Sequence, residues 1–180
     1  MQIEVIRSRR KTIAIHITHN CTVQVRAPQH LTNSDIQRFL EQKASWIAEN
    51  LDKLAAQCDT PKLTDEELHR LTDAARQDLS SRCARFAPAV QVTYGRNSIR
   101  HLLSRWGSCS AKGNLNFNCL LMLAPEEVRD YVVVHELCHR KHMNHSPAFW
   151  NEVDKILPHY PVQRRWLKEH GTALIAKLPK

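Results

Sequence analysis

The segment "HELCH", residues 135–139, has residue types and a spacing that suit metal-dependent hydrolysis. Its two histidines are four positions apart, which on a helix separates them by about 40° in projection and one turn along the axis. Both imidazoles can therefore point at one ion. Glu136 lies beside the first histidine and can reach a metal-bound water without binding the metal. The motif predicts a metal centre in which His135 and His139 are ligands and Glu136 is the general base.

A hydrolytic zinc site needs a third protein ligand and one open position. Zn²⁺ is the expected cofactor because it suits three imidazoles with an open fourth position, although nickel or cobalt could occupy such a site in vitro. The pKa of the bound water would fall toward ~7, and Glu136 would take its proton and pass it to the leaving group. The candidates for the third ligand are His145, His142 and the more distant carboxylates of Glu152 and Asp154.

His145 is the predicted third ligand. If the motif helix continued, His142 would share the face of the two ligands but would lie about 4.5 Å further along the axis. Pro147 disfavours helical geometry at the residue before it, so the motif helix is expected to end near residues 143–144. Asn144 tolerates the left-handed conformation that ends helices, which would turn His145 back onto the metal. His142 and the two carboxylates stay open as alternatives.

The helix that carries this motif is expected to be buried. The run "YVVV" directly precedes it, and ionisable groups in a buried helix are costly unless a metal and hydrogen bonds compensate. Pro125 suits the first helical position, and two glutamates follow at the positive end of the helix dipole. Ser146 and Pro147 begin the next helix, and a last helix is predicted from about Pro161 to His170, with Gly171 as its cap.

The rest of the chain must position this helix, and we expect one domain over residues 1–180. Alternating apolar residues predict an antiparallel strand meander in residues 1–30, which Pro28 ends. Residues 31–88 are predicted to form long helices, one from Leu31 to about Gln57 and one from a Thr64 capping box to Ala87. Residues 89–170 would form the zinc core, beginning with three antiparallel strands near 89–94, 98–107 and 114–121.

Net charge, hydropathy and cysteine spacing limit the classes of protein to which this chain can belong. The net charge of +8, from 26 Lys and Arg against 18 Asp and Glu, favours anionic partners. No apolar stretch approaches the ~20 residues that span a bilayer, and the N-terminus has no apolar signal core. We therefore expect a cytoplasmic protein without a membrane segment, whose six cysteines are reduced thiols. The cysteines never form Cys-x-x-Cys, which disfavours a thiolate zinc site, and buried thiols are expected in place of nucleophiles.

The motifs "RWGSCSAKGNLNFN", "LAPEEVRDYVVVHELCHRKHMNHSPAFW" and "RRWL" together resemble the YgjP-like zinc metallopeptidase family, which is related to WLM and SprT-like peptidases. The resemblance is strongest from Arg105 to Leu167. It implies a metallopeptidase with His135, His139 and His145 on the metal and Glu136 as the catalytic residue. The expected fold is α+β: an N-terminal strand region, long helices, then a zincin-like core of a small antiparallel sheet, an active-site helix and closing helices.

The substrate is less determined than the chemistry. Arg105, Gly107 and Arg140 are candidate substrate-binding residues, because cationic side chains favour acidic or phosphorylated substrates and Gly107 permits a close approach. A peptide or protein is the first expectation, and strand addition at the hairpin is one mode of binding. A nucleoside triphosphate pyrophosphohydrolase is the rival enzyme. A non-catalytic zinc-containing adaptor that binds DNA is a third reading, although no nucleic-acid motif supports it.

Overall fold

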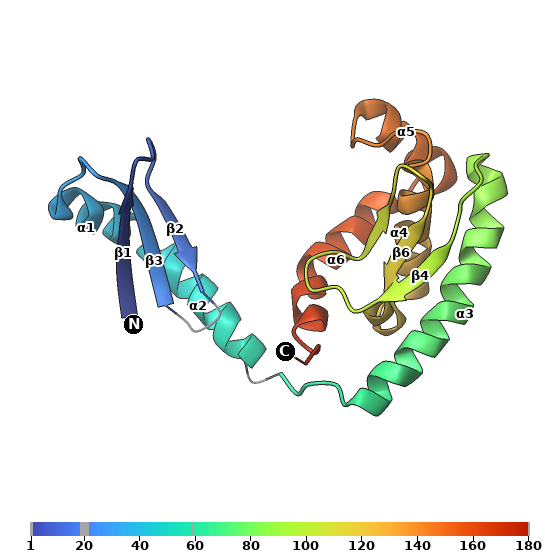
Figure 1. Cartoon of the computed structure of the whole chain (residues 1–180), viewed down its shortest axis with the longest axis horizontal. Coiled ribbons are helices and arrows are strands. Elements are labelled where there is room, and N and C mark those ends of the chain that lie inside the picture. Colours follow the sequence, from blue (N-terminus) through green and yellow to red (C-terminus); the bar gives the residue numbers. More distant parts are fainter. Residues whose placement is uncertain (1, 19–21, 59, 180) are drawn as a thin grey trace. The chain divides into compact units, whose positions relative to one another are not determined.

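The chain forms two compact units, Met1–Thr60 and Pro61–Lys180. The structure is a computed structural model that describes residues 2–18, 22–58 and 60–179, with the side chains of Gln2 and of residues 53–58 outside the description (Figure 1). Each unit has a hydrophobic core of its own. The organisation of residues 1–180 as one domain stays a prediction.

The first unit contains a three-stranded sheet whose central strand is the last in sequence. The strands are β1 (Gln2–Ser8), β2 (Ala14–Ile17) and β3 (Thr22–Pro28), in the order β1-β3-β2. Strand β3 pairs antiparallel with β2 but parallel with β1. The predicted antiparallel meander is therefore wrong, because alternation reveals which side chains face the core but not which strands are neighbours.

Two helices cover the core of this sheet: α1 (Asn33–Gln42) and α2 (Ala44–Cys58). Thr32 begins α1 through a capping box with Asp35. The single helix predicted from Leu31 to Gln57 is divided at Lys43, which ends α1. The core combines alternate residues of β3 with one face of the helices: Val23, Val25, Ala27, Ile36, Leu40 and Ile47.

The second unit begins with the long helix α3 (Asp65–Val90). The predicted capping box is confirmed, because Thr64 accepts a hydrogen bond from the Glu67 amide and the Glu67 carboxylate accepts one from the Thr64 amide. The helix was expected to stop before Pro88 but continues to Val90, which is only 1% exposed. Burial of Val90 in the core accounts for the extra turn.

A small sheet follows α3. Its strands are β4 (Asn97–Arg100), β5 (Gly107–Cys109) and β6 (Leu115–Asn118), in the order β4-β6-β5. Strand β6 is antiparallel to β5, as predicted, but parallel to β4. No strand forms over residues 89–94, and the predicted strand 98–107 is reduced to β4 and the first residue of β5. A 3-10 helix, Cys119–Leu123, replaces the end of the third predicted strand.

Three helices complete the second unit: α4 (Glu126–Cys138), α5 (Pro147–Ile156) and α6 (Tyr160–Ile175). Helix α4 contacts α3, α5, α6 and strand β5, so it is surrounded by the rest of the unit. Figure 1 shows α3 running along the edge of this unit. Helix α6 continues past Gly171, so the predicted cap is wrong; this glycine instead allows close packing, because a Cβ there would lie only 3.1 Å from the Trp106 ring.

The α+β fold class is confirmed, and its order is a strand region, long helices, a small sheet, the motif-bearing α4 and the closing helices α5 and α6. The four cysteines whose side chains are described, Cys83, Cys109, Cys119 and Cys138, are free thiols. Cys21 and the side chain of Cys58 lie outside the described residues. Within the described part of the chain, no helix has the length and apolar character needed to cross a bilayer.

Candidate metal centre

The imidazole rings of three histidines, two at the end of α4 and one just before α5, lie close together. His135 lies in the last turn of α4, His139 ends that helix, and His145 lies just before α5. One ring nitrogen of each lies within 4.8 Å of the others. The Nε2 atoms of His135 and His145 are 3.0 Å apart. The sequence separates these residues by up to ten positions, so the turn after α4 must create this cluster.

The chain reverses earlier than the sequence suggested. Helix α4 ends at Cys138, and hydrogen-bonded turns follow, in which the Arg140 and His142 amides donate to carbonyls of Leu137 and Cys138. The predicted helix end at residues 143–144 is therefore wrong. Asn144 is not left-handed, since Gln91 is the single non-glycine residue with positive φ among those described. The tight turns after Cys138 bring His145 to the cluster without that conformation.

His142 contributes its backbone in place of its imidazole. Its carbonyl oxygen lies 2.9 Å from His139 Nδ1, so that Nδ1–H of His139 donates to it. This contact fixes the tautomer of His139 and leaves Nε2 available as a ligand atom. The imidazole of His142 is not part of the three-histidine cluster.

The cluster fits a zinc ion chemically. Burial, followed by the charges of His139 and His145, lowers the pKa of His135 to about 3. Burial also lowers the pKa of His139. These two rings therefore favour their neutral form, which offers a lone pair to a metal. Three converging imidazoles are a donor set that zinc prefers.

Glu136 is a buried carboxylate packed against strand β5. It is 5% exposed, and its Oε2 atom is buried without a hydrogen-bond partner among the described residues. A Cβ added to Gly107 would lie 2.6 Å from its Oε1 and 2.7 Å from its Cγ. Burial raises the pKa of Glu136 to about 8, although the charge of Arg105 opposes this shift. Gly107 therefore provides the space that this carboxylate occupies.

An aromatic network packs behind the histidines. The Trp150 ring stacks on His145 with centroids 5.6 Å apart and on Tyr160 at 5.3 Å. Tyr160 stacks in turn on Tyr131, whose edge meets His135. Phe149, fully buried, also contacts the cluster. His145 is exposed, and its ring lies between the stacked indole of Trp150 and the edge-on ring of Phe149.

A cavity of about 260 Å³ opens over the histidines. Strand β5 lines one side of it with Ser108 and Cys109. Burial raises the pKa of the Cys109 thiol, which disfavours its thiolate at neutral pH. Cys138 is fully buried and its pKa is raised to about 12, so both thiols fit the expected inert role. The lining residues are Gly107, Ser108, Cys109, His135, Glu136, His139, Met143 and His145.

The two arginines singled out in the sequence lie in different surroundings. Arg105 is exposed, and its backbone carbonyl accepts a hydrogen bond of 3.2 Å from the buried amide of Asn118. Arg140 donates to the carbonyls of Thr93 and Ala111 at 3.0 and 3.4 Å. These bonds occupy Arg140 in holding two loops together, and it does not line the cavity.

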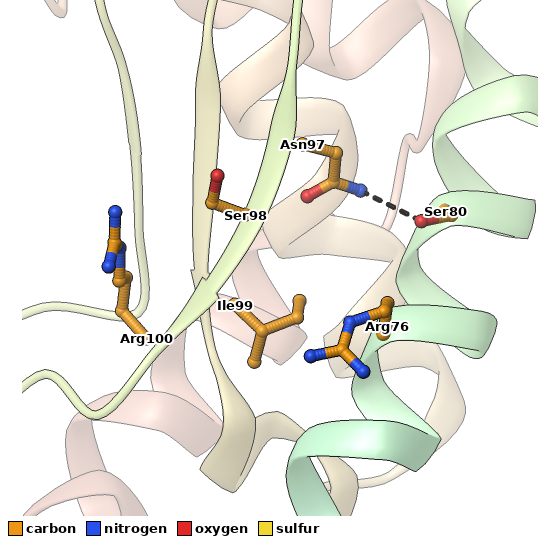
Figure 2. Close-up of a pocket in the computed structure, with 6 residues that line it drawn as sticks. All are labelled: Arg76, Ser80, Asn97, Ser98, Ile99 and Arg100. Atoms are coloured by element: carbon orange, nitrogen blue, oxygen red, sulfur yellow. Dashed lines mark hydrogen bonds between the residues drawn. The ribbon is translucent and has the colours of Figure 1, made fainter.

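A second cavity of about 260 Å³ lies between α3 and β4 (Figure 2). Asn97 reaches across it and donates a 3.3 Å hydrogen bond to Ser80 Oγ. Figure 2 shows Arg76 on the α3 side and Arg100 on the opposite side of the strand. The two guanidinium groups therefore do not converge on one ligand position.

Most of the chain matches the model of one protein family. The model of the YgjP-like family, described as a metallopeptidase domain, matches residues 11–72 and 60–170. The chain belongs to the YgjP-like family. Membership implies a hydrolase of the metallopeptidase type, which uses a metal ion and acts on peptides. No curated protein matches the chain significantly.

Two solved structures are similar to part of this YgjP-like chain. The metallopeptidase zymogen of abylysin from Pyrococcus abyssi is 23% identical and has a TM-score of 0.46, covering 51% of this chain and 93% of its own. The metallopeptidase zymogen of jannalysin from Methanocaldococcus jannaschii is 21% identical and has a TM-score of 0.44, covering 52% of this chain and 94% of its own.

Sequence reasoning missed the residues that pack around the histidines. Tyr131, Tyr160 and Arg164 were not expected near the site. Arg164 lies over the Trp150 ring, with its guanidinium carbon 4.5 Å from the ring centroid. The spacing of Tyr131 four residues before His135 was a signal for one of these contacts, since such pairs meet on a helix face. The contacts that come from α6 had no local signal.

Proposed function

We propose that this YgjP-like protein is a zinc-dependent metallopeptidase in which His135, His139 and His145 hold the ion. The observation that carries the proposal is the convergence of three imidazole nitrogens within 4.8 Å, beside a buried carboxylate. When bound, the zinc ion supplies Lewis acidity, which polarises the scissile carbonyl and raises the acidity of the attacking water.

Glu136 is the proposed general base. Its Oε2 atom has no hydrogen-bond partner in the described structure and lies in a side chain that lines the same cavity as the histidines. In the proposed reaction this carboxylate takes a proton from the attacking water and delivers it to the leaving amine. His142 assists through its carbonyl, which orients His139.

Strand β5 is the proposed docking edge for the substrate. It lies at the edge of the β4-β6-β5 sheet and lines the cavity through Gly107, Ser108 and Cys109. An edge strand presents unpaired backbone groups, so an extended peptide can pair with it and pass its scissile bond over the histidines. This mode favours peptide substrates over compact ones.

The decisive test is Glu136→Gln in the zinc-loaded full chain. We expect loss of peptide hydrolysis by about a thousandfold or more, with one zinc ion per chain still bound, measured by a fluorogenic peptide panel and by metal analysis. Glu127→Gln, in the exposed first turn of α4, is the matched control and should retain activity. Undiminished hydrolysis in Glu136→Gln would disprove the role of Glu136 as base.

The same experiment separates the other two functions. Release of pyrophosphate from nucleoside triphosphates, lost in Glu136→Gln, would favour the pyrophosphohydrolase. Salt-sensitive DNA binding that is indifferent to Glu136→Gln and to removal of the metal would favour the adaptor.

A separate pair of variants tests the third metal ligand: His145→Ala should weaken zinc binding far more than His142→Ala.

A further inference from the structure

Two arginines near the candidate centre form no salt bridge among the described residues. Arg164 comes from α6 and Arg105 from the loop before β5. The neighbouring cation Lys141, in contrast, pairs with Glu152 at 2.9 Å. Glu136 is the one carboxylate that lines the cavity in the described structure. The cavity lining therefore carries a single carboxylate, and neither arginine has an acidic side chain within salt-bridge distance in the described structure.

Arg164 stacks on an aromatic ring that also contacts two of the histidines. Its guanidinium carbon lies 4.5 Å from the centroid of Trp150, and the same ring is 5.6 Å from His145 and 5.8 Å from His135. Stacking uses the face of the guanidinium and leaves the N–H groups at its edge free to donate. Arg164 is exposed, so these donors are accessible to a bound substrate.

Arg105 lies in a different chain segment, the loop before β5. It lies two residues before Gly107, which touches the Glu136 carboxylate. Asn118, fully buried, fixes the local backbone by donating its side-chain amide to the Arg105 carbonyl and its backbone amide to the Trp106 carbonyl. The exposed Arg105 side chain thus extends from a rigid anchor beside the proposed base.

We propose that Arg164 and Arg105 select peptide substrates that carry an acidic side chain beside the scissile bond. This inference rests on the proposed peptidase function and names its substrate class. A guanidinium group donates two parallel hydrogen bonds to a carboxylate, and an amide of the same shape cannot replace the charge. Asp or Glu near the cleaved bond would therefore be recognised, and Asn or Gln in the same place would not.

Peptide binding to zinc-loaded Glu136→Gln protein tests this selection without requiring catalysis. Two labelled peptides that differ only by Asp or Asn beside the central bond are compared by fluorescence anisotropy. We expect the Asp peptide to bind about tenfold more tightly, and the preference to shrink as salt is raised. Adding Arg164→Gln or Arg105→Gln should weaken binding of the Asp peptide several-fold and leave the Asn peptide unchanged.

Matched variants make the result specific. Arg165→Gln removes an adjacent exposed arginine of α6 and should keep the preference, whereas Arg164→Lys should keep part of it. Equal or undetectable binding of the two peptides would overturn the proposal, as would an equal loss in Arg165→Gln. Binding of adenosine triphosphate that depends on Arg164, in place of the acidic peptide, would overturn it too.

The outcome is independent of the peptidase assignment. A preference for the Asp peptide in a protein that cleaves no peptide would refute the proposed function and support the recognition by the arginines. Efficient cleavage without any preference between Asp and Asn peptides would support the peptidase and refute the recognition.

Discussion

Gly107 has no side chain, and this is what allows Glu136 to lie against strand β5. A methyl group there would approach Oε1, Cγ and Cδ of Glu136 to between 2.6 and 2.9 Å. The carboxylate is buried and has little room to retreat. Adding a single methyl group at residue 107 is therefore expected to displace the Glu136 carboxylate.

Gly107→Ala should reduce kcat/KM for peptide hydrolysis by about a hundredfold, because the proposed base is displaced from its productive position. Zinc content should be unchanged, since the atoms nearest to a Cβ at this position all belong to Glu136. Steady-state kinetics and metal analysis measure the two effects. Gly95→Ala is the control, because its Cβ would meet the Asn114 side chain, which does not line the cavity over the histidines. Full activity in Gly107→Ala would contradict the close packing.

Trp150 is predicted to position His145 for metal binding. Trp150→Leu removes the ring that stacks on His145 at 5.6 Å and should weaken zinc binding about tenfold. Trp150→Phe keeps an aromatic face and should restore most of the affinity. Competition with a chromophoric chelator measures the dissociation constant. Trp46→Leu, at an exposed tryptophan of the first unit, is the control, and an equal loss of affinity there would contradict a specific role.

At the scale of elements, an ion network joins α3 to the motif helix α4. Arg82, only 9% exposed, donates to Asp78 at 2.7 Å within α3 and to Asp130 on α4. Arg129 on α4 completes the link by approaching Asp78 to 3.3 Å. Burial acts to raise the pKa of Asp78, but the hydrogen bonds and charges of Arg82 and Arg129 outweigh it and lower that pKa. The network therefore stabilises the α3–α4 contact that supports the centre.

Asp78→Asn should lower the free energy of unfolding by about 1–3 kcal/mol at pH 7. The folded pKa of Asp78 lies below its unfolded value near ~4, so the ion pair stabilises fully above that pH and is lost as the pH falls through the folded pKa. The difference between the variant and the parent protein should thus shrink on acidification. Urea unfolding at several pH values measures it.

Asp73→Asn is the matched control on the same helix. Asp73 pairs with Arg76, but both side chains are more than half exposed, at 57% and 67%. Such surface pairs contribute about 0–1 kcal/mol, so this variant should remain close to the parent protein. A difference for Asp78→Asn that does not change with pH would show that packing, and not charge, causes its effect.

At the scale of the whole molecule, the residues of the candidate centre all belong to the second unit. Its core runs from Leu68 to Leu178 and contains no residue of the first unit. Lys62 and Leu63 join the start of this unit to its end, through hydrogen bonds to the carbonyls of Ala176 and Lys177. The second unit thus has the core and the closing contacts that a self-standing domain needs.

Residues 61–180 alone should fold and bind zinc with the affinity of the full chain. Its buried apolar core supplies the stability, and all three histidines are retained. Circular dichroism, thermal unfolding and metal titration of the fragment measure this. A fragment that starts at residue 65 is the control: it lacks the Lys62 and Leu63 contacts and should unfold at a lower temperature. Failure of fragment 61–180 to fold would favour the single cooperative domain predicted for residues 1–180.

The helices and their caps were the most predictable part of the fold. Thr64, Ser146 and Pro147 act through neighbours three or fewer residues away, so their effects can be recognised in any short stretch. Strand partners were less predictable. Strand β1 pairs parallel with β3, and β4 pairs parallel with β6. The alternation of apolar and polar residues along a strand does not indicate which distant strand lies beside it.

The same physical division applies to the candidate centre. Residue types and the four-residue spacing within one helix were sufficient to name His135, Glu136 and His139, because helix geometry is local and regular. The sequence also predicted His145 as the third ligand, but with a helix end at residues 143–144. The tertiary structure shows instead that turns after Cys138 bring His145 to the cluster, and it gives His142 a backbone role and places Arg164 on Trp150. These contacts depend on tight turns and on α6 packing against α4, which follow from how the unit buries its core as a whole.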